Sequence, residues 1–285
     1  MALNLNALGK KIGPVVKEYT WRDVILYALG VGAGFDEFHF VHEKNLKVIP
    51  TFGIATIFDF FFEISKAANI DDVGLLHGEQ DLVCHRPIPS SGTFRAEGKI
   101  TRYYDKKEKG AIVIGEADTF AGDGEKLFTA IFSLFGRNDG GFGGEDAPRK
   151  VASFPERPPD FTVEALPSPN QPLLYRLSGD HHPLHSVPAF ARKAGFEKPI
   201  MHGMCTLGFA CRALIASLAP GKPEMVKRIA CRFTRTPYPG EPIQTLIWKG
   251  AEGKALWKTR NAKNGDTVID CGEFEYGELQ KGQSL

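Results

Sequence analysis

Two long apolar runs, each introduced by a glycine, stand out in the pattern of hydrophobic and polar positions along the chain. Residues 54–64 follow Gly53, and residues 204–218 follow Gly203, which lies 150 positions later. The second run is apolar nearly all round the helix that it predicts, so we expect that helix to be enclosed rather than to lie on a surface. Shorter alternating segments follow each run and predict strands at residues 99–104, 111–120, 126–135, 228–234, 243–249, 255–260 and 267–274.

The same order of elements therefore occurs twice. The Pro-x-Pro segments at residues 87–89 and 237–239 are again 150 positions apart, and each half contains a Gly-Asp turn, at residues 122–123 and 265–266. A curved antiparallel sheet wrapped around a buried helix accommodates both the enclosed helices and the strands. We therefore predict an α+β protein with a double hot-dog fold, in which two antiparallel sheets each wrap a central helix.

This repeat sets the expected domain organisation. Residues 1–137 form the N-terminal hot-dog, and residues 173–285 form the C-terminal one. Residues 138–172 are rich in glycine and proline, which predicts a linker crossing the surface.

The composition restricts the classes of partner. Of the 285 residues, 42% are hydrophobic and 24% charged, with a formal net charge of +1, so we expect no nucleic acid and no anionic membrane as a partner. No signal peptide and no apolar run of about 18 residues occurs, so we expect a protein that is neither secreted nor membrane-spanning. The five cysteines are dispersed and never spaced as Cys-x-x-Cys, which predicts free thiols.

The segment at residues 173–187 carries candidate chemistry. Asp180 precedes His185 by five residues, and Pro183 between them prevents a continuous helix. A loop can turn this carboxylate and this imidazole toward one water, as a general acid/base pair requires. An aspartate has an ordinary pKa of about 3.9 and a histidine one of about 6.5, so the first is charged and the second largely neutral near neutral pH.

Plainer interpretations of this segment also exist. Ser-Gly-Asp before a proline is an ordinary turn signal. A metal site formed by His181, His182 and His185 is the other alternative, but the proline disrupts helical spacing and no ligand-spaced cysteine or carboxylate set accompanies them. We therefore expect no metal.

The two copies differ where the chemistry lies. Aligning residues 27–30 with 175–178 places Gly32 near Asp180, and residues 31–34 offer no acid or base. We therefore expect the second copy to be catalytic and the first to be non-catalytic, with an interior freed by glycine to hold a ligand's tail. Gly203 begins the buried helix of the second copy, where backbone N–H groups favour an anion.

Five motifs resemble the hydratase 2 family, the MaoC-like (R)-specific 2-enoyl-CoA hydratases, including the hydratase unit of peroxisomal multifunctional enzyme type 2. They are Tyr175-x-Leu-Ser-Gly-Asp180-x-x-Pro183-Leu184-His185, the segment 199–204, and in the first copy the segments 19–23, 27–32 and 76–80. The resemblance covers nearly the whole chain. It implies reversible hydration of trans-2-enoyl-CoA to (3R)-3-hydroxyacyl-CoA in fatty-acid β-oxidation or related metabolism, and the degenerate first copy predicts that medium and long chains are accepted.

The resemblance also implies roles for individual residues. Asp180 and His185 would bind the attacking water, and the N–H of Gly203 would bind the thioester carbonyl. The family usually has asparagine two residues after the catalytic aspartate, whereas this chain has His182, so water positioning falls to an imidazole. The residues expected to contact the acyl-CoA are His77, Gly78, Lys106 and Phe233. CoA is part of the substrate, and no cofactor is expected.

Other interpretations stay open. A hot-dog acyl-CoA thioesterase uses a carboxylate and a helix N-terminus on the same thioester, and a non-catalytic acyl-CoA-binding protein would need no acid/base pair. We expect a peroxisomal or cytoplasmic protein, although Gln283-Ser284-Leu285 shares only its last residue with the peroxisomal Ser-Lys-Leu signal. A homodimer is also open.

Overall fold

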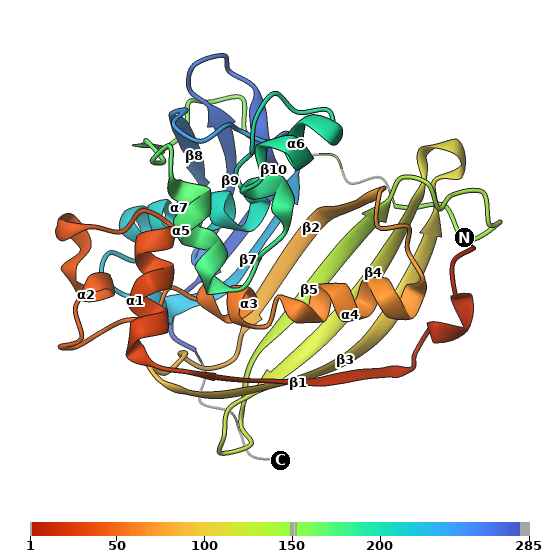
Figure 1. Ribbon diagram of the computed structural model, residues 1–285. Helices are drawn as coiled ribbons and strands as arrows, with labels where there is room; N and C mark the ends of the chain where they lie inside the picture. Colours follow the sequence, from red (N-terminus) through yellow and green to blue (C-terminus); the bar gives the residue numbers. More distant parts are fainter. Residues whose placement is uncertain (1, 149–150, 152, 280–285) are drawn as a thin grey trace.

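A computed structural model describes residues 2–148, 151 and 153–279 (Figure 1), so the C-terminal tripeptide considered above lies outside the described residues. The first half contains β1 (Lys11–Tyr19), α1 (Trp21–Gly30), α2 (Phe38–Val41), α3 (Phe52–Thr56), α4 (Asp59–Ala68), β2 (Leu75–Cys84), β3 (Gly92–Asp105), β4 (Ala111–Phe120) and β5 (Lys126–Gly136). The second half contains β6 (Phe161–Ala165), α5 (Gln171–Tyr175), α6 (Pro188–Lys193), α7 (Gly203–Leu218), β7 (Val226–Phe233), β8 (Ile243–Lys249), β9 (Lys254–Asn261) and β10 (Thr267–Tyr276).

The ten strands form one continuous sheet in the order β1-β3-β4-β5-β2-β7-β10-β9-β8-β6. Every pairing between these strands is antiparallel. The strand order is the same when read outward from the central β2–β7 pair in either direction, with β6–β10 repeating the roles of β1–β5. The repeat seen in the sequence is therefore a structural duplication, and the prediction of a double hot-dog fold is confirmed.

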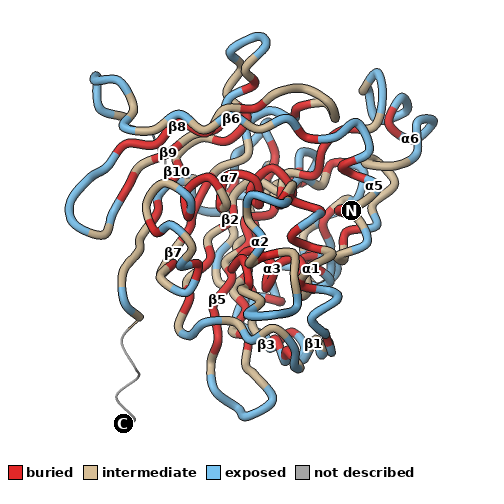
Figure 2. Tube along the Cα trace, turned by 90° about the vertical axis from the view of Figure 1, so that its left-hand side faces the viewer, coloured by how far each residue is buried: buried red, intermediate tan, exposed pale blue. Residues whose placement is uncertain are grey.

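The two central helices lie on the same side of the sheet. Helix α4 packs against β1, β3, β4 and β5, and α7 packs against β6, β7, β8 and β10 (Figure 1). In β4, a Cβ at Gly115 would lie 2.3 Å from the side chain of Ile64, so the glycine permits close approach of α4. Most residues of α7 are buried, as Figure 2 shows, which confirms the expected enclosed helix.

The first-copy helix departs from the expectation of one continuous helix over residues 54–64. Helix α3 ends at Thr56, and α4 begins at Asp59. Between them the N–H groups of Phe58 and Phe60 bond to carbonyls three residues earlier, which tightens the backbone into a 3₁₀-type turn. The sequence pattern does not reveal such a break, because the buried residues before and after the break are both apolar.

The strands β1 and β6 were absent from the expected set, and β2 is the strand expected, without bounds, between the first-copy helix and the first Pro-x-Pro segment. β6 falls inside the expected linker and pairs with β8 at the sheet edge, so that segment contributes a strand to the C-terminal half as well as crossing the surface. The other predicted strands are present with ends shifted by a few residues, β3 most of all because it begins at Gly92.

The expectation of free thiols is confirmed for the buried cysteines, which are Cys84, Cys205, Cys211 and Cys231. Among the described residues, no helix has both the length and the apolar character needed to cross a membrane.

Candidate active site

A glycine shapes the turn that presents Asp180. Gly179 follows the 3₁₀ turn Arg176–Ser178 with φ of 141°, a backbone conformation that residues with a Cβ rarely adopt. A Cβ there would also lie 2.4 Å from the carbonyl oxygen of Ala55 in α3. The Ser-Gly-Asp motif is therefore explained by close approach to the first copy and by backbone geometry.

Asp180 is 8% exposed and accepts a hydrogen bond from the His182 N–H at 3.1 Å. The imidazole of His182 accepts a hydrogen bond from the Leu184 N–H through Nδ1 at 3.4 Å, and its edge meets the ring of Phe190. These contacts hold the His182 ring against its own loop. The water-positioning role of His182 stays a prediction.

His185 lies in the next 3₁₀ turn, Pro183–His185, and its ring is held by a backbone carbonyl. Nδ1 is 3.0 Å from the oxygen of Ile200, and since a carbonyl can only accept, Nδ1 carries the proton. Nε2 is left with a lone pair. Burial lowers the pKa of His185 below its ordinary value, while the negative charge of Asp180 acts to raise that pKa.

His202 forms a second layer behind His185. The two imidazoles stack with centroids 3.8 Å apart and planes at 27°, and His202 is only 1% exposed. Its Nε2 lies 3.2 Å from the carbonyl oxygen of Asp180, whereas its Nδ1 is enclosed and has no hydrogen-bond partner among the described residues. Burial, followed by the neighbouring His185, holds the pKa of His202 well below its usual range.

The sequence favours a capping or packing role for His202 over a catalytic one, and its stacking against His185 confirms the packing. His202 is the N-cap residue of α7, but its side chain makes no cap hydrogen bond. The one local sequence signal that His202 lies at the site is its position directly before Gly203.

Gly203 is the first residue of α7, so its N–H has no acceptor within the helix. A Cβ at this position would lie 3.1 Å from the ring of Phe233, which makes glycine the best fit. Phe233 in turn lies 5.0 Å from the ring of His77. The structure thus brings three of the sequence-predicted residues together at the junction of the two copies.

His77 enters this junction from β2, surrounded by aromatic rings. Its neighbours are Phe58, Phe61, Phe132 and Phe233. Burial lowers its pKa to about 4, while contacts with the Glu79 backbone and the Gln80 side chain act in the opposite direction. His77 and Gly78 both lie within β2, at a shift in its register with β5, so a turn before the strand, which is the plain alternative to a substrate contact, is not present.

Lys106 lies apart from these side chains. It is exposed after β3, with its ammonium 5.9 Å from the ring of Phe135. Phe135 pairs with Leu76, the residue before His77, so Lys106 flanks the β2 end of the site. The expected contact of Lys106 with CoA therefore stays a prediction.

Gly32 of the first copy does not open the space that we expected. A Cβ at Gly32 would lie 2.3 Å from the ring of Phe209 and 3.0 Å from the guanidinium of Arg212, both on α7. Arg212 also forms a half-buried ion pair with Glu37 and donates a hydrogen bond to the carbonyl of Val31 at 2.8 Å. Gly32 therefore permits α7 to pack closely, and the prediction of a freed interior at this position is wrong.

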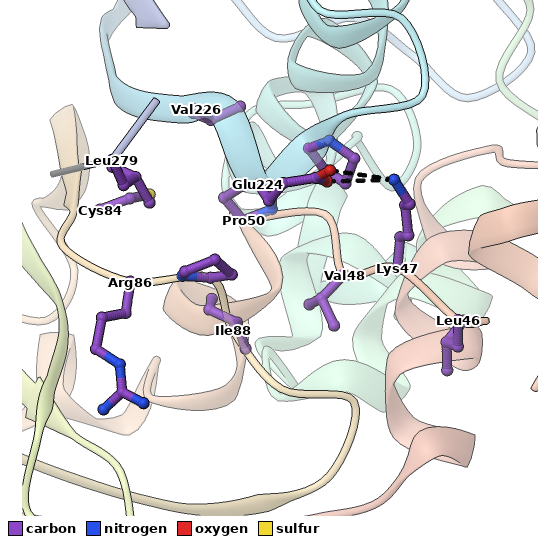
Figure 3. A pocket seen from close by; sticks show the side chains of 12 residues that line it. Leu46, Lys47, Val48, Pro50, Cys84, Arg86, Ile88, Glu224, Val226 and Leu279 are labelled. Carbon is purple, nitrogen blue, oxygen red and sulfur yellow. Dashed lines mark hydrogen bonds and ion pairs between the residues drawn. The ribbon is translucent and has the colours of Figure 1, made fainter. Parts of the chain in front are cut away.

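A cavity of about 160 Å³ lies elsewhere, between the segment before α3, the end of β2 and the start of β7 (Figure 3). Pro50 and Pro87 in its lining precede Ile200 and Pro237 by 150 residues, but residues 31–34, which align with the Asp180 loop, do not line it. Its acid, Glu224, is paired with Lys47 at 3.2 Å, and its described lining contains no histidine. The acid/base pair belongs to the second copy.

The histidine set considered in the sequence is not the one that the fold brings together. Among the described residues, Asp180, His185 and His202 each offer a ligand atom within 4.8 Å of the other two, whereas His181 is exposed and outside the cluster. Two imidazoles and a carboxylate are chemically able to hold a divalent metal ion. They are equally able to hold a water between a carboxylate and an imidazole.

Comparison with known proteins follows this division into two copies. Residues 18–138 match the family model of the MFE-2 hydratase 2 N-terminal domain, and residues 150–270 match the MaoC-like domain. The 3-hydroxyacyl-thioester dehydratase Y of Mycobacterium tuberculosis is 38% identical over 97% of this chain and 99% of its own. The peroxisomal enoyl-CoA hydratase 2 of Arabidopsis thaliana is 35% identical over 92% of each chain.

A solved structure agrees with these matches. The crystal structure of a MaoC-like dehydratase from Phytophthora capsici superposes with a TM-score of 0.86 at 30% identity, covering 96% of this chain and 99% of that one. Both copies and the whole fold are thus shared with one group of proteins. The chain belongs to the MaoC-like hydratase 2 family.

Proposed function

We propose that the protein is an (R)-specific 2-enoyl-CoA hydratase, which reversibly adds water to trans-2-enoyl-CoA and gives (3R)-3-hydroxyacyl-CoA. The observation that carries this proposal is the meeting of Asp180 and His185 beside the N-terminus of α7. The names of the relatives support the same reaction, since they are enoyl-CoA hydratases and a 3-hydroxyacyl-thioester dehydratase.

The hydrogen bonds of the site define how the water would be held. Because Nδ1 of His185 donates to Ile200, Nε2 acts as an acceptor, and the carboxylate of Asp180 is a second acceptor. A water that donates one hydrogen bond to each has its oxygen lone pairs directed away from both groups, toward C3 of the enoyl group. The hydroxyl then bonds to C3, the remaining proton is passed through the acid/base pair, and C2 receives a proton.

The thioester oxygen gains negative charge as C3 is attacked. The N–H of Gly203 and the positive end of the α7 dipole supply stabilisation for that charge. The helix runs for 16 residues, most of them buried, so its N-terminus is held rigidly. Gly203 is assigned this role because its N–H has no intrahelical acceptor and lies next to the imidazole layer.

The acyl chain would extend toward the first copy. The aromatic side chains around His77 come mainly from that copy and adjoin Phe233 and Gly203. This apolar surrounding supports acceptance of medium and long chains. A higher turnover with crotonyl-CoA than with trans-2-decenoyl-CoA would contradict this part of the proposal.

The setting of the reaction is fatty-acid β-oxidation or related acyl-CoA metabolism. A peroxisomal location is supported by the name of the Arabidopsis relative, and a cytoplasmic one by the bacterial relative. Association of two chains is a separate question, which the mass of the protein in solution answers.

One experiment tests the reaction and its stereochemistry together. The protein is incubated with trans-2-decenoyl-CoA, and the 3-hydroxy product is resolved by chiral chromatography while free thiol is measured in parallel. We expect the (3R) product and no release of CoA. An (S) product contradicts the family mechanism, free CoA indicates a thioesterase, and binding without turnover indicates an acyl-CoA-binding protein.

A further inference from the structure

We propose that His202 is a positioning residue, which holds Asp180 and His185 in the arrangement that their reaction with water requires. It acts through these two residues rather than on the substrate. The role rests on the proposed function, because it concerns the acid/base pair of the hydration reaction. His202 is linked to the ring of His185, to the backbone of Asp180 and to the peptide of Gly203.

The first link limits the tilt of the His185 ring. The Nδ1–H of His185 donates to the oxygen of Ile200 at 3.0 Å, but a hydrogen bond at one edge of a ring leaves its plane able to tilt. The ring of His202 lies over one face of the imidazole, with centroids 3.8 Å apart and planes at 27°. The edge contact and the face contact together fix the direction of the Nε2 lone pair, which is the acceptor in the proposed mechanism.

The second link holds the backbone that carries the carboxylate. The Nε2–H of His202 donates to the carbonyl of Asp180 at 3.2 Å, since a carbonyl can only accept. The carboxylate itself accepts a hydrogen bond from the His182 N–H at 3.1 Å, within the loop. The main chain of Asp180 is therefore restrained from the start of α7, and its side chain is restrained separately by the loop.

The third link is covalent. The N–H proposed to bind the thioester oxygen belongs to the peptide between His202 and Gly203. This stretch of backbone is itself held, because the carbonyl of His202 accepts hydrogen bonds from the N–H and the hydroxyl of Thr206 at 3.1 and 3.2 Å. The N–H of Met201 also donates to the carbonyl of Pro237 at 3.1 Å. One residue thus ties both members of the acid/base pair and the oxyanion donor to the first turn of α7.

A histidine provides all of this with one side chain. The contact with His185 uses a flat ring, and the bond to Asp180 uses an N–H donor. Phenylalanine offers the ring alone, and glutamine offers the donor alone. Burial holds the pKa of His202 well below its usual range, so its ring is uncharged. An uncharged neighbour does not oppose the proton that His185 carries during the reaction.

Substitutions at His202 separate the ring from the donor. His202→Phe keeps a ring, and His202→Gln keeps a donor. We expect each to lower kcat for trans-2-decenoyl-CoA hydration by about 10- to 100-fold, with KM changed by less than about threefold, because misplacement of reacting groups by about 1 Å costs about that much in rate. The control is His85→Gln, which removes a half-buried histidine at the opposite end of β2 from His77 and should match the wild type. His202→Asn replaces His202→Gln if circular dichroism shows that the latter misfolds.

A double variant tests whether the ring of His202 acts through His185. Groups that act as a unit are not additive, so adding His202→Gln to His185→Gln should cause less than about a twofold further loss of kcat. A further loss as large as in the wild-type background would place the effect of His202 elsewhere and overturn the proposal. A kcat within about twofold of the wild type in both His202→Phe and His202→Gln would also overturn it.

A spectroscopic measurement tests the stacked rings without activity. In protein containing ¹³C-labelled histidine, the Hε1 resonance of His185 is assigned from its absence in His185→Gln. We expect His202→Gln to move that resonance, because the ring current of the stacked imidazole is removed, and His85→Gln to leave it in place. An unmoved resonance would overturn the positioning role. A moved resonance in a protein that does not hydrate the substrate would instead overturn the proposed function alone.

Discussion

The pKa of His77 predicts a pH-dependent contribution to stability that the aromatic surroundings make measurable. Burial lowers this pKa to about 4, against about 6.5 for an unfolded histidine. The folded state therefore disfavours the charged ring. Its contribution to stability is fully present above the unfolded pKa and is lost as the pH falls from about 6.5 toward about 4, because the unfolded chain binds the proton more readily there.

The magnitude follows from the difference between the folded and unfolded pKa values. This difference corresponds to roughly 3 kcal/mol, of which about 2.5 kcal/mol is lost between about pH 7.5 and about pH 4.5. Other groups also titrate in this range, so the comparison must be made against a variant. His77→Phe fills a similar volume among the surrounding rings and cannot be protonated.

The assay is urea unfolding of the wild type and of His77→Phe at both pH values, followed by circular dichroism and by fluorescence. We expect the wild type to lose about 2.5 kcal/mol more than His77→Phe on acidification. His181→Gln, which changes an exposed histidine, serves as the control and should retain the wild-type pH dependence. Equal losses in wild type and His77→Phe would show that the His77 ring is solvated, and would refute the reasoning.

Three further predictions concern the candidate site. Asp180→Asn and His185→Gln should each lower kcat for trans-2-decenoyl-CoA hydration by at least about 10²-fold with unchanged circular dichroism, and near-normal turnover in either would remove that residue from the mechanism. Because the lowered pKa of His185 keeps its Nε2 an acceptor in mild acid, the acid limb of kcat/KM should have its midpoint below about pH 6.5, and a midpoint above that would contradict the assignment. Gly179→Ala should lower the free energy of unfolding in urea by about 1–3 kcal/mol, because of the positive φ at Gly179 and its close approach to Ala55. The control Gly122→Ala, which has open space around it, should change that free energy little. Equal effects of the two substitutions would argue against strain at Gly179.

Local patterns in the sequence were sufficient for much of the fold. The enclosed helix α7 and most strands have clear periodicity, and the 150-residue repeat reveals the duplication. The bounds of β2 stayed open, because Glu79 and Asp81 interrupt the apolar pattern of that segment. In the structure those charges form ion pairs across the sheet. Glu79 pairs with Arg232 at 2.6 Å, and Asp81 pairs with Arg228 at 2.8 Å. Pairing between distant strands is not visible in a local pattern.

The site shows the same limit. The spacing of Asp180 and His185 around Pro183 is a local signal, and the fold places both side chains together. His202 lies 17 residues after His185, and its stacking depends on how the N-terminus of α7 meets the loop. The filling of the space at Gly32 by Phe209 likewise depends on packing between α1 and α7. Residue type alone could not decide whether that glycine opens a space or permits a contact.

The register of the central pair explains why β2 can contribute to both the sheet exterior and the site. In a regular strand, His77 would share a face with Glu79 and Asp81, since side chains two residues apart point the same way. A register shift between His77 and Glu79 interrupts this alternation at Gly78. His77 consequently joins Phe61 and Phe132, while Glu79 and Asp81 form ion pairs with β7. Those pairs hold β7 in the register that places Phe233 beside His77 and over Gly203, so the junction of the two copies determines the geometry of the candidate site.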